Sequence, residues 1–397
     1  MDNSIIKLDN VVQHYPWGSS TALSELFGID NPDHVPQAEI WMGSHPNGCS
    51  KILTSGKTLA ELILEDPNQV LGNYTADRFG DLPFLFKVLA AEKPLSVQVH
   101  PSKKKAEEGF EKENSLGIAL GASNRNFKDG NHKPELVYAL TFYKAMNGFR
   151  PISDIVSLFN QAKIESLRND IDTLQANQHE KGLKAFFSVV MNLSGERKQQ
   201  ALSELFRALA DGAKTLKARE AFSLISEFKR DYDDDIGLFS PLLLNVIELE
   251  PGDAMFLHAE TPHAYVRGVG LEIMANSDNV LRAGLTPKYM DVSELIENTK
   301  FIPTPSERIK LLPYQMENKL GYPIPVDDFG FEIINVDLTS RKQYVRSAEI
   351  LFCIEGKVDI TVLNTTVTLA AGESAFVSCN SRGYNYRGSG VLARAFN

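Results

Sequence analysis

Side chains that could hold a metal ion occur in three separated segments of the sequence. They are Gln98 and His100 in the first segment, Glu135 in the second and His263 in the third. A catalytic metal site needs neutral imidazoles and carboxylates that converge from different strands and leave one position open. These four residues offer nitrogen and oxygen without a thiolate, which suits zinc, with iron, manganese or cobalt as substitutes. Spacing alone leaves open the alternative that they are ordinary polar groups of a core or a loop.

The sequence before His263 has turn chemistry that would bring this histidine into a β-barrel. Residues 251–253, Pro-Gly-Asp, indicate a turn, because proline presets one dihedral angle and glycine frees another. The apolar run 254–257 predicts a short buried strand, and a second turn at 260–262 places His263 at the start of the next strand. This arrangement is typical of cupin barrels. We interpret His258, near the expected barrel mouth, as a partly exposed residue with no role.

Residues 94–101 alternate between polar and apolar side chains. On a strand, Ser96, Gln98 and His100 would share one face and the apolar residues the other. The apolar face would pack on a core, whereas the polar face would be solvated or would line a cavity. Lys87 interrupts the apolar run 82–91, and it would either reach the surface or pair with an acid or an anion.

The composition restricts the class of protein. A chain of 397 residues, 43% hydrophobic and 23% charged, indicates a globular protein of two or three domains. The net charge of -10 argues against nucleic-acid binding. The absence of an apolar run of about 18 residues argues against a membrane span. Three scattered cysteines and no signal-like N-terminus predict a cytoplasmic protein with reduced thiols.

The hydrophobic period divides the chain into three predicted domains. Residues 1–150 together with 236–317 would form a cupin-type, jelly-roll catalytic β-barrel, with surface helices expected at 102–112 and 292–297. Residues 151–235 have helical periodicity and predict an all-helical insert. Residues 318–397 repeat the strand and turn pattern without a histidine, which predicts a second, cupin-like β-barrel. The acidic run 231–235 lacks the spacing of a calcium loop, so we interpret it as a solvated helix end.

Six ordered segments then make the chain recognisable as similar to a known family. They are residues 15–18 (Tyr-Pro-Trp-Gly), 38–43 (Ala-Glu-Ile-Trp-Met-Gly), 94–101 (Pro-Leu-Ser-Val-Gln-Val-His-Pro), 131–135 (Asn-His-Lys-Pro-Glu), 262–265 (Pro-His-Ala-Tyr) and 277–288 (Ser-Asp-Asn-Val-Leu-Arg-Ala-Gly-Leu-Thr-Pro-Lys). With these motifs the chain resembles the type I phosphomannose isomerases, and the match extends over most of the first three quarters of the sequence.

The resemblance implies a zinc enzyme, with one Zn²⁺ per chain, that interconverts mannose 6-phosphate and fructose 6-phosphate. It implies Gln98, His100, Glu135 and His263 as the zinc ligands, and it implies Arg282 as an active-site residue. It also implies a cupin catalytic domain, a helical domain and a second cupin-like domain, in agreement with the pattern of the sequence.

The implied reaction requires further catalytic and substrate-binding residues. A base must move a proton between C2 and C1 through an enediol, and Lys133 and Glu272 are equal candidates for it. Arg282 would stabilise the enediolate or bind the phosphate, or would only pair with an acid to fix its loop. A hydroxyl and ammonium groups suit a phosphate dianion, and Ser96, Lys87 and Lys288 supply them. The sugar site would be lined by Tyr265 and Trp17.

Two other functions fit parts of the pattern less well. A cupin dioxygenase normally has a His-x-His pair, and Gln98 replaces the first histidine here. A non-catalytic sugar sensor would not need Glu272, Lys133 and Arg282 beside a full ligand set. We therefore expect a sugar-phosphate substrate, no nucleic acid and no membrane. We expect a monomer, with a dimer as the alternative.

Overall fold

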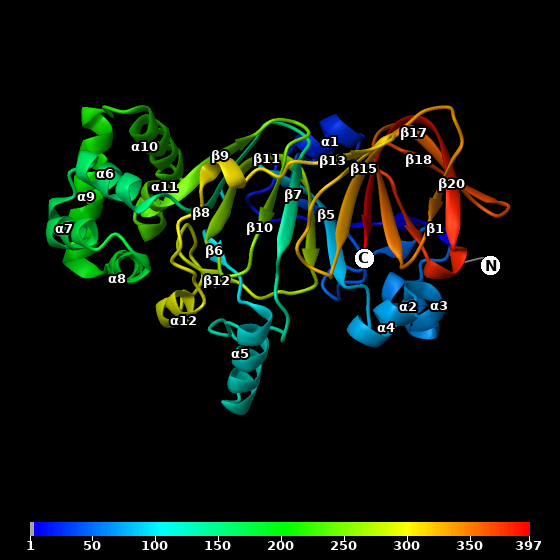
Figure 1. Cartoon of the computed structure of the whole chain (residues 1–397), viewed down its shortest axis with the longest axis horizontal. Helices are drawn as coiled ribbons and strands as arrows, with labels where there is room; N and C mark the ends of the chain where they lie inside the picture. Colours follow the sequence, from blue (N-terminus) through cyan, green and yellow to red (C-terminus); the bar gives the residue numbers. More distant parts are fainter. Residues whose placement is uncertain (1–3) are drawn as a thin grey trace.

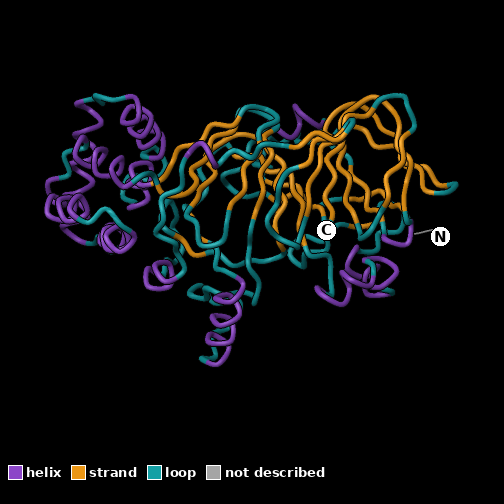
Figure 2. Tube along the Cα trace, viewed as in Figure 1, coloured by secondary structure: helices purple, strands orange, loops and turns teal. Residues whose placement is uncertain are grey.

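The structure, a computed structural model that describes residues 4–397, consists of three parts in a row. Figure 1 shows a group of helices at one end and two strand-rich parts beside it, with both chain ends near the second of these. Figure 2 shows the same division between purple helices and orange strands. A mainly β fold with a helical insert is therefore confirmed. None of the helices in residues 4–397 is long and apolar enough to cross a membrane.

The first strand-rich part contains the sheet that carries most of the candidate site. Its strands run in the order β10-β7-β11-β5-β3-β2, with β6, β8, β9 and β12 paired off this path. The bounds are β2 (Val11–Gln13), β3 (Glu39–Met42), β5 (Phe84–Ala91), β6 (Gln98–Val99), β7 (Glu135–Ala139), β8 (Tyr143–Phe149), β9 (Leu244–Leu249), β10 (Ala254–Leu257), β11 (His263–Ala275) and β12 (Leu281–Arg282). All eight residues of β5 are buried, which explains its continuous apolar run.

Strand β11 joins the two halves of this part. Its first residues pair with β6 and β8, and its last eight pair with β5, with a register shift between Tyr265 and Arg267. The strand thus carries His263 at one end and Glu272 towards the other. Across the ladder, Glu272 lies opposite Lys87, and Lys87 lies opposite Trp41. Residues directly opposite one another project to the same face of a sheet, so register alone gathers these three side chains.

The second strand-rich part is built mainly from the C-terminal residues. Its sheet follows the order β13-β14-β15-β20-β17-β19-β1-β4, with β16 and β18 at its sides. The bounds are β1 (Ile5–Asp9), β4 (Lys51–Ile52), β13 (Tyr314–Met316), β14 (Lys319–Gly321), β15 (Gly330–Val336), β16 (Arg341–Tyr344), β17 (Glu349–Val362), β18 (Thr365–Ala370), β19 (Ser374–Val377) and β20 (Gly383–Phe396). Strand β1 pairs with β19, although the sequence analysis grouped all of residues 1–150 with the catalytic domain.

The sheets differ from the prediction in one respect: within residues 4–397, neither strand order returns to its first strand. Each sheet ends at strands of two to four residues, such as β2 and β4, where hydrogen bonding stops. The expected closed barrels are therefore open, folded sheets. Short edge strands are a common way to limit unwanted pairing at such an edge.

The helical insert packs directly on the first strand-rich part. It contains α6 (Ile152–Gln161), α7 (Arg168–Ala176), α8 (Glu180–Met191), α9 (Gly195–Asp211) and α10 (Leu216–Phe228), followed by α11 (Ser240–Leu243). Apolar residues of these helices share one core cluster with Val97, Val99, Ala264 and Leu281. The insert therefore supports the strands that carry the candidate ligands.

Two surface helices agree with the sequence, and four short helices were missed. Helices α5 (Lys103–Ser115) and α12 (Val292–Glu297) occur where they were expected. The missed helices are α1 (Ala22–Phe27), α2 (Leu59–Glu65), α3 (Pro67–Leu71) and α4 (Asn73–Phe79). With five to seven residues each, they are too short to establish a period. The capping box formed by Thr58 and Glu61 was the available signal.

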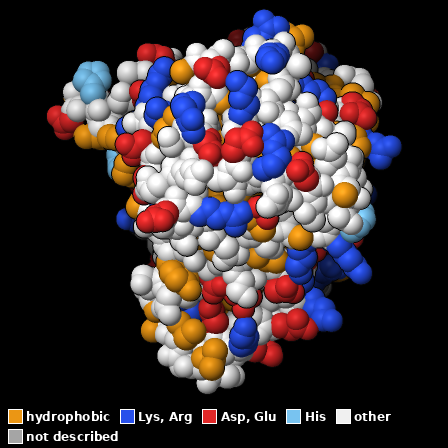
Figure 3. All heavy atoms as spheres, turned by 90° about the vertical axis from the view of Figure 1, so that its left-hand side faces the viewer, with side chains coloured by type: hydrophobic (Ala, Val, Ile, Leu, Met, Phe, Trp, Pro, Cys, Tyr) orange, Lys and Arg blue, Asp and Glu red, His pale blue; other side chains and the backbone are white. Residues whose placement is uncertain are grey.

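The outer end of the helical insert carries mixed charge. Figure 3 looks at this end and shows blue and red side chains interspersed, with small hydrophobic patches between them. Ion pairs between its helices and loops include Arg197 with Asp170 and Lys198 with Asp234. This face has no extended region of one sign, in line with the expectation of a small-molecule substrate.

The C-terminal sheet, which has no histidine, contains a buried cluster of charged side chains. Arg394 Nε donates to Glu349 Oε2 at 2.7 Å, and Arg394 Nη1 donates to Glu332 Oε2 at 2.8 Å. The Tyr384 hydroxyl also donates to Glu349, at 3.1 Å. All four residues are less than 9% exposed. Because each charge is buried, the free energy cost of its desolvation must be offset by these partners.

Replacing Glu349 by alanine would remove the partner that Arg394 and Tyr384 share, while the cation stays buried. We expect Glu349→Ala to lower the free energy of unfolding by about 3–5 kcal/mol, measured by urea denaturation. Glu355→Ala is the matched control, because Glu355 lies on the same strand but is exposed. Equal effects of the two variants would contradict a structural role for the cluster.

Candidate active site and metal centre

Two histidines and a glutamate converge in the catalytic part. His100 follows β6, Glu135 starts β7 and His263 starts β11. His100 Nε2 lies 3.3 Å from Glu135 Oε1, and His263 Nε2 lies 3.6 Å from Glu135 Oε2. One nitrogen or oxygen atom from each residue lies within 4.8 Å of the others, and all three residues are buried. The three atoms are close enough to bind one ion together.

The hydrogen bonds of the two histidines fix which nitrogen faces Glu135. His100 Nδ1 lies 2.6 Å from the carbonyl oxygen of Asn279, and His263 Nδ1 lies 2.9 Å from that of Thr261. A carbonyl oxygen only accepts, so each Nδ1 carries the proton and donates it. Each Nε2 therefore directs a lone pair towards a carboxylate that also only accepts.

This arrangement of acceptors fits a divalent metal ion. Within residues 4–397, His100 Nε2 is buried and has no hydrogen-bond partner. A buried polar atom without a partner is costly, and three facing acceptors repel one another unless a cation lies between them. Backbone carbonyls that hold the second nitrogen of each histidine are also the usual support of metal-binding imidazoles.

Burial and charge favour the protonation states that a metal requires. Burial lowers the pKa of His100 and lowers the pKa of His263 to about 4, so both imidazoles are neutral near pH 7. Burial opposes ionisation of Glu135, but Lys133 and the two histidines outweigh it and hold the pKa of Glu135 well below its usual range. Neutral imidazoles and an ionised carboxylate are the ligand forms that bind divalent metals.

Two neighbours extend this cluster. Gln98 lies opposite His263 in the strand ladder, and its amide nitrogen donates to Ser96 Oγ at 3.1 Å, so its carbonyl oxygen is the atom that could bind a metal. The Tyr265 hydroxyl donates to Glu135 Oε2 at 3.0 Å. Tyr265, predicted to line a sugar site, therefore also orients the carboxylate of the cluster.

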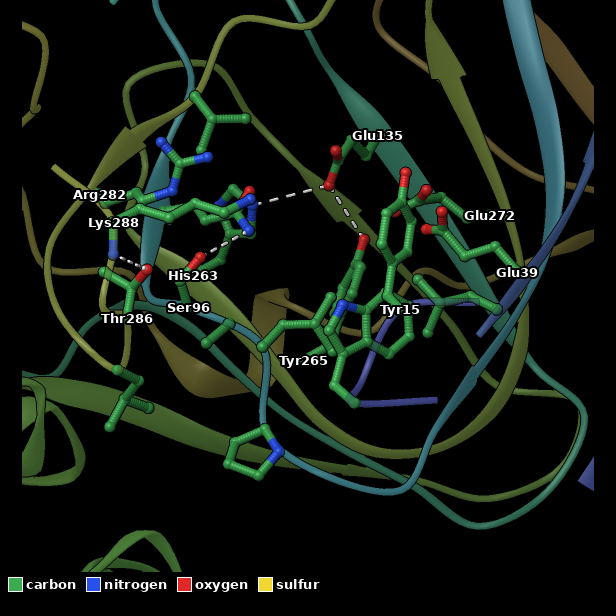
Figure 4. Close-up of a pocket in the computed structure, with 18 of the residues that line it drawn as sticks. Tyr15, Glu39, Ser96, Glu135, His263, Tyr265, Glu272, Arg282, Thr286 and Lys288 are labelled. Carbon is green, nitrogen blue, oxygen red and sulfur yellow. Dashed lines mark hydrogen bonds and ion pairs between the residues drawn. The ribbon is translucent and has the colours of Figure 1, made fainter. Parts of the chain in front are cut away.

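The cluster borders a cavity of about 670 Å³. Figure 4 shows acids and aromatic rings on one side of it and cationic side chains on the other. The structure brings together nearly all sequence-predicted site residues, because the cavity is lined by Trp17, Lys87, Ser96, Gln98, Lys133, Glu135, His263, Tyr265, Glu272, Arg282 and Lys288. His100 lies behind the wall, next to Glu135. His258 is exposed and does not line this cavity.

One side of the cavity contains a buried network around Lys87. Lys87 Nζ lies 2.9 Å from Glu272 Oε2 and 3.5 Å from Glu39 Oε1, and Trp41 Nε1 donates to Glu39 Oε2 at 2.7 Å. Burial works to lower the pKa of Lys87, but Glu272 and Glu39 outweigh it and raise that pKa. Lys87 thus does not extend to the surface, which the sequence had left as one alternative. Burial raises the pKa of Glu272, and Lys87 limits that rise.

The opposite side of the cavity contains two cations without a counter-ion. Within residues 4–397, neither Arg282 nor Lys288 forms a side-chain ion pair or hydrogen bond. Burial lowers the pKa of Arg282, and burial together with Arg282 lowers the pKa of Lys288. Two unpaired cations in one pocket are suited to a bound anion. Lys133 differs, because its ammonium lies 3.0 Å from Glu135 Oε1.

Several lining residues were not assigned a role from the sequence. Glu39 lies in a quoted motif, but nothing in that motif indicated that its carboxylate pairs with Lys87. Asp231 and Tyr232 reach the cavity from the end of the helical insert, which sequence spacing could not indicate. His132, which lies in the motif of residues 131–135, does not line the cavity but pairs with Asp328 at 3.0 Å.

The two β-sheets with their helical insert and the buried His-Glu-His cluster, which could hold a metal ion, are features of a cupin-type protein. Models of the type I phosphomannose isomerase catalytic domain and helical insertion domain match residues 5–152 and 158–244. A model of the mannose-6-phosphate isomerase cupin domain matches residues 318–397, which confirms the cupin nature of the C-terminal part. The chain belongs to the type I phosphomannose isomerase family.

Relatives match over nearly the whole chain. A mannose-6-phosphate isomerase of Salmonella typhimurium is 49% identical over 394 residues, covering 98% of this chain and 99% of the relative. The Homo sapiens mannose-6-phosphate isomerase is 34% identical over 407 residues, covering 95% and 94%. A crystal structure of a mannose 6-phosphate isomerase with zinc and yttrium bound has a TM-score of 0.93 at 48% identity, with 99% of both chains covered.

The Tyr265 hydroxyl provides a test of the metal centre. Tyr265→Phe would remove the hydrogen bond to Glu135, and we expect the affinity for Zn²⁺ to fall about tenfold, the usual size of such outer contacts. Competition with a chromogenic chelator measures this affinity.

Tyr143→Phe is the matched control for this test. The Tyr143 ring packs against Tyr265, but its buried hydroxyl has no hydrogen-bond partner within residues 4–397. We expect unchanged Zn²⁺ affinity in this variant. If both variants bound Zn²⁺ as the parent does, Tyr265 would not orient a metal ligand.

Proposed function

We propose that this protein is a zinc-dependent aldose-ketose isomerase that interconverts mannose 6-phosphate and fructose 6-phosphate through an enediol. The observation that carries the proposal is one cavity that contains converging metal-ligand atoms, candidate bases and two unpaired cations. Membership of the family and the zinc-bound relatives support the same function. The substrate needs all three features, because a proton must move, an oxygen must carry charge and a phosphate must be held.

We assign one Zn²⁺ per chain to Gln98, His100, Glu135 and His263. The short distances between His100, Glu135 and His263 support their assignment as ligands. The assignment of Gln98 is supported by its place opposite His263 in the strand ladder. A divalent ion bound there would supply Lewis-acid stabilisation of negative charge on the sugar oxygens. Tyr265 would hold Glu135 in the orientation that this set requires.

The proton transfer is assigned to Lys133 or Glu272. In the open-chain aldose, the base takes the proton from C2 while O1 gains a proton, which gives the enediol; the base then returns its proton to C1 while O2 loses its proton, which gives the ketose. Both side chains line the cavity from neighbouring strands or turns. Glu272 is supported by burial, which raises its pKa towards the range useful for a base. Lys133 is supported by its place beside Glu135.

The phosphate is assigned to Arg282, Lys288 and Ser96. The two cations lack counter-ions, and the Ser96 hydroxyl lies on the same side of the cavity. Lys87 was predicted here too, but its two carboxylate partners would repel a dianion. We propose that Lys87 instead positions Glu272. Trp17 would line the sugar site, stacked with Tyr15 at a ring-centroid distance of 5.7 Å.

We also propose that one chain suffices for activity, because every assigned residue of this chain either lines the cavity or, like His100, contacts a residue that lines it. The division into a catalytic domain of residues 1–150 with 236–317, a helical insert of 151–235 and a C-terminal domain of 318–397 is retained as a working proposal. In this division, β1 and β4 belong to the catalytic domain by residue number, but they pair within the C-terminal sheet.

Isomerase activity and its metal dependence test the proposed function. We expect conversion of mannose 6-phosphate to fructose 6-phosphate, loss of activity after chelation and recovery when Zn²⁺ is added back. A coupled assay for fructose 6-phosphate follows the reaction. Activity that persists in fully metal-free protein would remove the zinc assignment, and no activity in zinc-loaded protein would remove the isomerase itself.

Separate variants distinguish the two candidate bases. We expect the variant that lacks the true base, Lys133→Ala or Glu272→Gln, to lose about 100-fold or more in kcat with a smaller change in KM. Zinc content of each variant is measured in parallel, because Lys133 lies beside Glu135. A residue whose variant retains kcat near that of the parent is not the base.

The phosphate assignment predicts a difference between Lys288 and Lys87. Lys288→Ala should raise KM for mannose 6-phosphate about tenfold with little change in kcat, because a charged contact to the substrate is lost. Lys87→Met should reduce kcat instead, since Glu272 loses its partner. Steady-state kinetics separate the two constants. The reverse pattern would restore Lys87 as the phosphate ligand and exclude Lys288.

A further inference from the structure

The acidic run at the end of the helical insert includes one carboxylate that holds another segment of the chain. Asp235 Oδ1 accepts hydrogen bonds from the backbone nitrogens of Gly237 at 2.6 Å and Leu285 at 2.8 Å. Asp235 Oδ2 accepts one from the backbone nitrogen of Thr286 at 3.1 Å. The interpretation of residues 231–235 as a solvated helix end is therefore wrong for Asp235, although Asp233 and Asp234 are exposed.

The segment that Asp235 holds is residues 284–288, which we name the cation loop. It begins two residues after Arg282 and ends at Lys288, and within residues 4–397 both of these cations are unpaired. On its other side, Ala283 N donates to the Val97 carbonyl at 2.8 Å, and Val97 N donates to the Gly284 carbonyl at 3.0 Å. The loop is thus held between residues 96–98 of the catalytic part and Asp235 of the insert.

The backbone of the cation loop needs this support. Leu285 has a φ of 52°, in the left-handed region that non-glycine residues rarely adopt. Asp235 accepts hydrogen bonds from the amide nitrogens of Leu285 and Thr286, which flank the strained Cα of Leu285. A carboxylate that accepts two successive backbone N–H groups can hold a conformation that the local sequence disfavours.

A contact between two glycines gives a second, independent observation. A Cβ atom on Gly284 would lie 2.4 Å from Gly237 Cα, and one on Gly237 would lie 2.5 Å from Leu285 N. The insert segment and the cation loop are therefore in direct backbone contact. Neither position has room for any side chain without separating the two segments.

We propose that Asp235 is a positioning residue for the sugar-phosphate site: it ties the cation loop to the helical insert so that Arg282 and Lys288 face the cavity. The proposal rests on the function assigned above, in which these cations bind the phosphate. It gives the helical insert a specific task, since its last segment fixes the loop and contributes Asp231 and Tyr232 to the cavity wall. Within residues 4–397, the Asp235 carboxylate accepts hydrogen bonds from backbone groups only, and Asp235 is not a catalytic residue.

Kinetics of Asp235 variants test the proposal. Asp235→Ala loses all three hydrogen bonds, and we expect KM for mannose 6-phosphate to rise about tenfold or more with kcat within about threefold of the parent. The inhibition constant for inorganic phosphate should rise in parallel, because the same cations bind it. Asp235→Asn keeps the Oδ1 acceptor but turns an amide towards Thr286 N–H, so its effect should be intermediate.

Two further variants keep the test specific. Asp234→Asn is the matched control: Asp234 is adjacent and exposed, and among residues 4–397 its side chain pairs with the insert residues Lys198 and Gln199 alone, so both constants should be unchanged. Gly237→Ala should reproduce the effect of Asp235→Ala, because its Cβ would push the cation loop away. Zinc content and thermal stability are measured for every variant. If Asp235→Ala fails to fold, Asp235→Asn and Gly237→Ala carry the test.

The outcomes separate this proposal from the function on which it rests. A parent enzyme without isomerase activity would overturn the proposed function. An active parent whose folded Asp235 and Gly237 variants keep KM and the phosphate inhibition constant within about twofold would overturn only the positioning role. A fall in kcat with unchanged KM would also overturn it, because the loop would then act on the chemical step.

Discussion

The site depends on one electrostatic constraint: three buried acceptors face one another. The Nδ1 hydrogen bonds of His100 and His263 to backbone carbonyls leave both Nε2 lone pairs directed at the Glu135 carboxylate. Such a set is unfavourable in a dry interior unless a cation compensates it. Lys133 supplies part of that charge beside Glu135, and a divalent ion would supply the rest. The surrounding fold can be understood as the means of keeping these three groups together.

Strand register and loop anchoring keep them together. The long strand β11 carries His263 and Glu272 on one continuous backbone, and its ladder places Gln98 and Lys87 opposite them. The helical insert shares a core with the strands beneath the site, so its apolar packing stabilises the ligands indirectly. Through Asp235 it also reaches the cation loop. In the proposed function, proton transfer and phosphate binding would thus depend on different parts of the chain that meet at one cavity.

Much of this arrangement could be predicted from the sequence, because alternation and period are local properties. The short strand at 254–257, the helical insert and the helix at 292–297 follow from them directly. The ordered motifs contain most of the residues that line the cavity, although Lys87, Glu272, Asp231 and Tyr232 lie outside them. The sequence could not indicate which residues far apart along the chain form ion pairs or hydrogen bonds with each other. Lys87 is paired with Glu39 and Glu272, and Asp235 binds backbone groups about fifty residues away; neither pattern has a local signature. The exchange of β1 into the C-terminal sheet was missed for the same reason.

The most direct test of the central claim is anomalous X-ray diffraction at the zinc edge from crystals of the zinc-loaded protein. The account predicts one strong peak per chain, within coordination distance of His100 Nε2, His263 Nε2 and a Glu135 oxygen, about 2.0–2.2 Å from each. It also predicts that the Gln98 carbonyl oxygen borders this peak. A zinc-loaded crystal with no peak among these residues, or with its only strong peak elsewhere, would contradict the account.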